Sequence, residues 1–101
     1  MYGTIARFRV LPGKREEMIS LLAQDQDLVV DGWLADYVYQ MDRDSDEFFM
    51  VAFFESKGAY RDNADSPEQH FRYLRWRELL ADDPEWNDGL VVLANGPRAH
   101  R

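Results

Sequence analysis

His70 is the side chain in this sequence best suited to acid–base chemistry near neutral pH. An imidazole exchanges its proton between about pH 5 and 8, and Phe71 and Tyr73 follow His70 closely in the chain. A histidine beside aromatic rings can act as a general base that removes a phenolic proton from a bound ligand. The alternative is an ordinary surface histidine, flanked by Gln69 and Arg72.

Polar and aromatic residues near His70 could line a cavity for a flat aromatic ligand. Aromatic rings provide stacking area, while an amide or a phenol can fix a hydroxyl or carbonyl group of the ligand. The same rings could instead pack only against the protein core. The candidate lining residues are Tyr60, Asn63, Tyr73 and Trp76.

Arg7 and Arg9 alternate with Phe8 and therefore share one face of an extended segment. Guanidinium groups bind carboxylates through paired hydrogen bonds, so Arg7 could hold an anionic ligand. Ion pairs with the many acidic side chains of this chain are the alternative.

The acidic segment 42–46 has part of a metal-binding spacing. Asp42, Asp44 and Asp46 match positions one, three and five of a calcium-binding loop. Glu47 replaces the glycine of position six, and Phe53 replaces the glutamate of position twelve. The chain also has no cysteine and no paired-histidine motif. We therefore expect a turn at 42–46, and neither a metal nor a cofactor.

The composition limits the possible partners. Twelve Lys and Arg residues against 19 Asp and Glu give a net charge of −7, and an acidic chain repels phosphate backbones. No apolar run approaches the roughly 20 residues that span a bilayer. Residues 1–7 lack the basic and apolar regions of a signal peptide. We expect a cytoplasmic protein with neither nucleic-acid nor membrane partners.

The apolar run from Phe48 to Phe54 is the centre of the predicted fold. It contains no polar residue, and such a run is typical of a strand that is buried on both faces. Ser66 followed by Pro67 is a strong helix start. The predicted elements are strands at 2–10, 33–41, 48–54 and 89–94, and helices at about 13–27, 56–63 and 66–81.

This order predicts a ferredoxin-like α+β fold, βαββαβ, with a four-stranded antiparallel sheet in a single domain over 1–95 and a tail at 96–101. Right-handed crossovers place the long helices on one face of the sheet and leave the other face bare. Alternation puts Trp33, Tyr37 and Tyr39 on one face of their strand. An exposed apolar face usually marks an interface, so we expect a homodimer through the sheet face. A ligand mouth is the alternative role for these three rings.

Three segments carry a resemblance to a known family. They are Leu11-Pro12-Gly13-Lys14, the FESKGAY segment at 54–60 and the NADSPE segment at 63–68. With the element order, they resemble the antibiotic biosynthesis monooxygenase superfamily of dimeric α+β barrel proteins, over about residues 2–93. The resemblance implies a homodimer whose sheets face each other, with a cavity between sheet and helices in each subunit.

The resemblance also implies an activity. Members with assigned activity oxidise quinol-like or anthrone-like aromatics with O2, often without metal or flavin. Phe54 stands where many members have a tryptophan, and Asn63 resembles a polar amide of the quinol-oxidising type. One branch of the family cleaves haem and carries its haem-ligating histidine near Tyr73, so no haem is expected in this chain.

Two hypotheses follow. In the first, the protein is a cofactor-independent monooxygenase that acts on a small aromatic quinol or polyketide-like substrate. In the second, it is a non-catalytic dimer that binds a small hydrophobic ligand in the same cavity. The candidate catalytic residues are His70 and Asn63, and the candidate substrate-binding residues are Tyr60, Tyr73, Trp76, Phe54 and Arg7.

Overall fold

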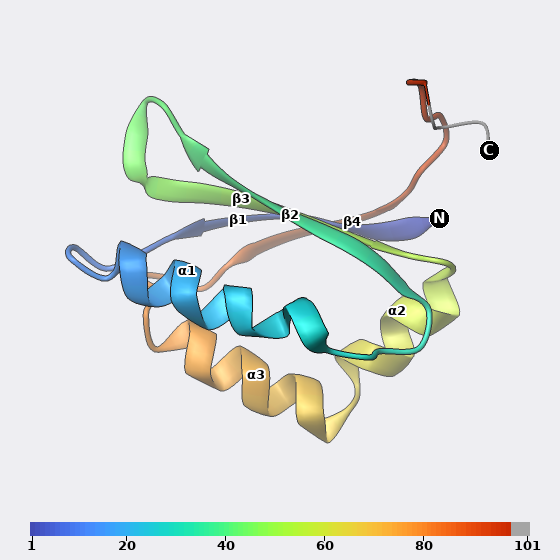
Figure 1. Cartoon of the computed structure of the whole chain (residues 1–101), viewed down its shortest axis with the longest axis horizontal. Helices are drawn as coiled ribbons and strands as arrows, with labels where there is room; N and C mark the ends of the chain where they lie inside the picture. Colours follow the sequence, from blue (N-terminus) through green and yellow to red (C-terminus); the bar gives the residue numbers. More distant parts are fainter. Residues whose placement is uncertain (98–101) are drawn as a thin grey trace.

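The computed structural model describes residues 1–97, with the backbone alone at Gln26. Four strands form one antiparallel sheet in the order β2-β3-β1-β4, and three α-helices lie on one side of it (Figure 1). This arrangement confirms the predicted ferredoxin-like α+β fold. Residues 98–101 of the predicted tail lie outside the described part of the chain. The elements are β1 (Tyr2–Arg9), α1 (Arg15–Ala23), the 3₁₀ helix η1 (Gln24–Asp27), β2 (Trp33–Met41), β3 (Asp44–Phe54), α2 (Lys57–Ala64), α3 (Pro67–Arg77) and β4 (Glu85–Leu90).

Two serine caps define the helices that close the cavity described below. The Ser66 hydroxyl accepts a hydrogen bond from the backbone N–H of Gln69 at 3.1 Å, and Pro67 occupies the first turn of α3. The Ser56 hydroxyl caps α2 in the same way. Each cap satisfies a backbone donor that the helix itself cannot pair. Both predicted helix starts are therefore confirmed.

The core lies between the sheet and helices α1 and α3. The rings of Phe8 and Phe48 stack at 5.5 Å, and Trp76 meets Phe8 edge-on at 4.9 Å. Met18 from α1 and Val10 complete this buried group. Fully burying one such side chain contributes roughly 1.5–3 kcal/mol, so these residues fix the spacing between sheet and helices.

Helix α3 ends earlier than predicted, at Arg77 and not near residue 81. The chain leaves the helix because Leu80 forms an isolated bridge with Val10, and the backbone N–H of Leu11 donates to the carbonyl of Leu79 at 2.9 Å. Pairing with the end of the sheet thus replaces the last predicted helical turn.

The final strand was predicted at 89–94, and this prediction is wrong for most of its length. Strand β4 runs from Glu85 to Leu90, where it pairs with β1 from Arg7 back to Tyr2. Beyond Leu90 only the backbone N–H of Val91 still finds a partner, the carbonyl of Met1 at 2.9 Å. The strand ends because the chain has passed the start of β1.

A β-bulge in strand β2 separates Trp33 from the tyrosines with which it was expected to share a face. Trp33 pairs with Phe54 and Ala35 pairs with Phe53, so the register shifts by one residue between them. The prediction of one shared face is therefore wrong for Trp33, which lies on the helix side with Phe54. Tyr37 and Tyr39 remain on the opposite face. The extra residue reverses the alternation at that point.

The helix-free face of the sheet carries large apolar side chains. Ile5, Tyr37 and Tyr39 are 51%, 59% and 53% exposed, and the ring of Tyr37 meets that of Phe53 at 6.4 Å. Phe49, Val51 and Phe53 lie half-buried between them. Within residues 1–97, no helix has the length and apolar character needed to cross a membrane.

Candidate functional site

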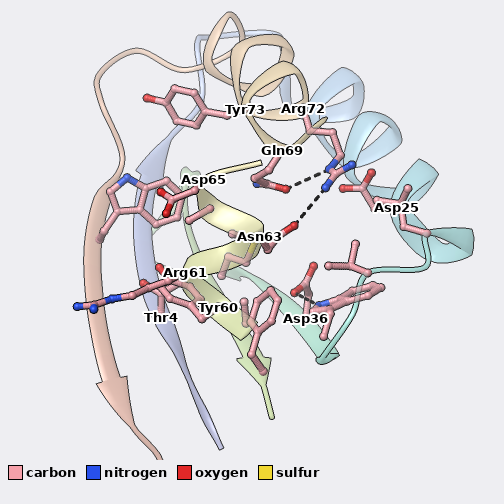
Figure 2. Close-up of a pocket in the computed structure, with 18 of the residues that line it drawn as sticks. Thr4, Asp25, Asp36, Tyr60, Arg61, Asn63, Asp65, Gln69, Arg72 and Tyr73 are labelled. Carbon is pink, nitrogen blue, oxygen red and sulfur yellow. Dashed lines mark hydrogen bonds between the residues drawn. The ribbon is translucent and has the colours of Figure 1, made fainter. Parts of the chain in front are cut away.

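A cavity of about 560 Å³ lies between the helix side of the sheet and the helices (Figure 2). Its walls come from all four strands, from α1, α2 and α3, from η1, and from the segment that joins η1 to β2. Volumes of this size hold small aromatic ligands. The fold therefore provides an internal site at the position where the family resemblance implied one.

The cavity brings together most of the site residues that were named from the sequence. Its aromatic and apolar lining includes Phe54 on β3, Tyr60 on α2, and Tyr73 and Trp76 on α3. The polar lining includes Asn63 on α2 and His70 on α3, and the His70 side chain is also exposed to solvent.

Arg7 does not lie in this cavity. Its side chain is on the helix-free face, where the Arg7 Nε donates to Glu47 Oε2 at 2.7 Å. Arg43 Nε donates to the other oxygen of Glu47 at 2.6 Å. These two guanidinium groups, Arg43 first, lower the pKa of the Glu47 carboxyl. Arg9 likewise pairs with Asp44 at 2.6 Å, so both arginines make the ion pairs given above as the alternative to anion binding.

One wall of the cavity is a cluster of aromatic rings. Trp76 lies 6.1 Å from Tyr73 and 5.8 Å from Trp86, measured between ring centroids, and all three rings line the cavity. Trp86 was not among the sequence candidates because it was placed before the final strand. In β4 it pairs with Ala6, on the helix side of the sheet. Its large ring was the available signal.

Tyr60 joins helix α2 to strand β4 at one end of the cavity. Its hydroxyl donates to Asp88 Oδ1 at 2.7 Å. Burial, and then this hydrogen bond, raise the pKa of Tyr60 to about 12. The Tyr60 ring meets Tyr2 at 5.4 Å and Phe54 at 5.5 Å, both edge-on. Tyr60 is therefore a neutral, well-positioned phenol at neutral pH.

Two carboxyl groups line the cavity on the side of β2 and η1. Asp36 Oδ1 accepts a hydrogen bond from Trp33 Nε1 at 2.8 Å, a contact that the bulge makes possible. Burial raises the pKa of Asp36, although the Trp33 hydrogen bond works against this, and the charge of Asp25 raises it further. Burial also raises the pKa of Asp25 against the lowering effects of Arg72 and Arg75.

Neither acid was a candidate from the sequence. Asp36 was visible as a lone acid between apolar residues of a strand, on the face opposite Tyr37. That signal could not be used without knowing that this face meets a cavity.

Arg72 reaches from α3 toward Asn63 and Asp25 (Figure 2). Its Nε donates to Gln69 Oε1 at 3.1 Å, and its Nη2 donates to Asn63 Oδ1 at 3.4 Å. Asn63 is thereby oriented by a guanidinium group. The sequence gave Arg72 no role beyond a position next to His70.

No group of three His, Asp or Glu side chains within residues 1–97 is arranged to hold a metal ion. The polar groups of the cavity are instead spread singly around an aromatic and apolar wall. The lining suits an organic ligand with a few oxygen functions.

Comparisons with known proteins agree with this architecture. The structure is similar to SnoaB, a cofactor-independent oxygenase from Streptomyces nogalater, with a TM-score of 0.80 and 15% identity over 92% of this chain and 94% of that one. It is also similar to a protein named a putative antibiotic biosynthesis monooxygenase from Bordetella bronchiseptica, with a TM-score of 0.81 and 19% identity over 91% and 97% of the two chains. A conserved protein from Methanosarcina mazei gives a TM-score of 0.77 and 20% identity over 87% and 89%.

At these identities the three structures establish a shared fold. No curated protein matches the chain in sequence. The family model described as antibiotic biosynthesis monooxygenase, however, matches residues 1–72, well over half of the chain. This chain therefore belongs to the antibiotic biosynthesis monooxygenase family.

Proposed function

We propose that the protein is a cofactor-independent monooxygenase that acts on a small aromatic quinol or polyketide-like substrate. The observation that carries the proposal is the aromatic-walled cavity of about 560 Å³, into which single polar groups project from the helices. SnoaB, which has the same fold, is described as a cofactor-independent oxygenase. Family membership and cavity chemistry thus support the same reaction class.

The proposed chemistry needs a base, an aromatic clamp and O2. A base removes a proton from the substrate, and the resulting carbanion reacts with O2 to form a hydroperoxide. For an anthrone-like CH2 group, both C–H bonds break, a C=O bond forms with one oxygen atom, and the other oxygen leaves as water. The substrate supplies both electrons for this reduction, so the balance requires no further reductant.

His70 is the first candidate for the base, and Asn63 the candidate for holding a substrate oxygen. Both line the cavity, and an imidazole titrates in the range that general bases use. Asp36 is a second candidate, because a carboxylate with a raised pKa is a stronger base than an ordinary one. The substrate rings would be held by Tyr60, Tyr73, Trp76 and Phe54.

We further propose that the working form is a homodimer through the helix-free sheet face. The three exposed side chains Ile5, Tyr37 and Tyr39 support this proposal, because isolated apolar faces of this kind are usually covered. A second copy offers the same surface, so a two-fold interface covers both faces at once.

One observation favours the alternative, a non-catalytic dimer that binds an aromatic ligand. His70 is exposed to solvent, whereas a base that works on a desolvated substrate is usually enclosed. A binding protein needs only the aromatic wall and the single polar groups.

The deciding experiment is oxygen uptake by the purified protein with a panel of hydroquinones and anthrones, in buffer free of metals and flavins. The monooxygenase proposal expects quinone formation that falls strongly in His70→Ala or in Asp36→Asn, with His100→Ala as the matched histidine control. Binding of the panel without oxygen uptake, and with an unchanged ligand spectrum in air, would establish the binding alternative instead.

A further inference from the structure

Arg72 is held in the cavity wall by two neutral amides. Gln69 Oε1 accepts from its Nε at 3.1 Å, and Asn63 Oδ1 accepts from its Nη2 at 3.4 Å. Figure 2 shows the guanidinium group between these two side chains at the cavity edge. An arginine that is fixed by neighbours before a ligand arrives loses little side-chain entropy when it binds one.

The amides orient the guanidinium group but leave its charge uncompensated. Within residues 1–97, no carboxylate oxygen lies within 4.0 Å of the Arg72 nitrogens. The charge of Arg72 does act on Asp25 at longer range, where burial nevertheless keeps the pKa of Asp25 raised. Arg72 therefore differs from Arg7 and Arg9, whose charges are already paired with acids.

An arginine has five N–H donors, and two of the five on Arg72 are used by the amides. The remaining donors form no hydrogen bond within the described part of the chain. Guanidinium groups bind oxyanions better than neutral oxygens because charge and paired donors act together. An ionised oxygen is thus the ligand group that completes this site.

We propose that Arg72 is an anion-binding residue of the cavity, and that its ligand is a planar aromatic molecule carrying an ionised oxygen group. The aromatic wall formed by Trp76, Tyr73 and Trp86 binds the ring, and Arg72 binds the oxyanion. A carboxylate and an acidic phenolate share this chemistry. The inference deepens the proposed function, because it rests on the same cavity and states which aromatic substrates enter it.

The test compares ligands that have one shape and two charges. The affinity of the full-length protein is measured by calorimetry for 2-naphthoate and for the neutral 2-naphthamide. The wild-type protein is expected to prefer the carboxylate, and Arg72→Gln to weaken 2-naphthoate binding by roughly tenfold or more while leaving 2-naphthamide unchanged. Arg75→Gln removes an equal charge from the same helix at a residue that does not line the cavity, and should change neither affinity by more than roughly twofold.

Two further measurements sharpen the test. Arg72→Lys keeps the charge but loses the planar fork, so its preference for the carboxylate should be intermediate. The visible dye 4-nitro-1-naphthol separates the two anion sources: if Arg72 also binds phenolates, the wild-type protein should shift the titration of the bound dye to lower pH, and Arg72→Gln should not. Circular dichroism verifies that each variant is folded.

The outcomes are distinct. Equal losses for 2-naphthoate and 2-naphthamide in Arg72→Gln, or an equal loss in Arg75→Gln, would overturn the inference while leaving the monooxygenase proposal intact. Arg72-dependent binding of the anion without oxidation of any quinol supports the inference and counts against the monooxygenase. If neither naphthalene binds, both the inference and the aromatic site of the proposed function fall.

Discussion

The hydrogen bond from Tyr60 to Asp88 joins helix α2 to strand β4, and its removal should loosen one end of the cavity. Tyr60→Phe deletes the hydroxyl but keeps the ring, so the edge-on contacts with Tyr2 and Phe54 remain. Hydrogen bonds to charged acceptors contribute about 1.5–3 kcal/mol when buried. Because this pair is partly exposed, we expect Tyr60→Phe to lower the free energy of unfolding by about 1 kcal/mol.

That loss should lower the melting temperature by roughly 4–8 °C in a domain of this size. It is measured by thermal unfolding at pH 7 with far-UV circular dichroism. Tyr39→Phe is the matched control, since the Tyr39 hydroxyl makes no hydrogen bond within residues 1–97. The pairwise contribution is obtained from the cycle of Tyr60→Phe, Asp88→Ala and the double variant.

The effect should also depend on pH. The pKa of Tyr60 is raised to about 12 in the fold, whereas an unfolded tyrosine titrates near about 10. The folded chain holds the phenolic proton to higher pH than the unfolded chain does. The contribution of this proton is therefore complete below about pH 10 and is lost as the pH rises toward 12. The advantage of the wild-type protein over Tyr60→Phe should shrink over that window. Additive effects in the cycle, or a constant advantage across the window, would refute this account of Tyr60.

Three shorter predictions test other parts of the structure. Asp36→Asn should unfold at higher urea concentration than the wild-type protein at pH 7, and at the same concentration at about pH 3, because the raised pKa of Asp36 means that stability falls as this carboxyl ionises; a destabilised variant at pH 7 would contradict the burial argument. Gly32→Ala should lose about 1–3 kcal/mol of stability, because Gly32 has a φ of 77° and a new Cβ would lie 2.5 Å from a Cβ of helix α2. Gly89→Ala, where nothing lies within 4 Å, is its control, and equal losses would rule out the clash. Phe53→Glu on the helix-free face should convert the proposed dimer to a monomer in sedimentation experiments, whereas Phe71→Glu on the exposed side of α3 should not; a dimer in both variants would place the interface elsewhere.

The sequence predicted those parts of the fold whose signals are local. The caps at Ser56 and Ser66 depend on a few neighbouring residues, and both helices begin where the caps indicate. The apolar run 48–54 needs cover on each face wherever it lies in the chain, and it forms most of the central strand β3. These signals require no knowledge of distant residues.

The errors concern elements whose limits are set by a distant partner. Strand β4 ends near Leu90 because β1 begins at Tyr2, and the apolar residues after Leu90 cannot show this by themselves. Helix α3 ends early because Leu80 pairs with Val10. The same reason explains why Asp36 was missed as a site residue: its surroundings come from η1 and α3, which are distant from β2 in the chain.

The bulge in β2 has a consequence for comparing this chain with its relatives. Residues before and after the bulge obey opposite odd–even rules, so Trp33 faces the cavity although odd-numbered Tyr37 and Tyr39 face away from it. Deleting one residue there would turn the indole toward the proposed dimer interface and remove the donor that holds Asp36. A single-residue gap at this position of an alignment is therefore a change of cavity chemistry. Related chains of similar composition can differ in this way in what they bind without any substitution in the helices.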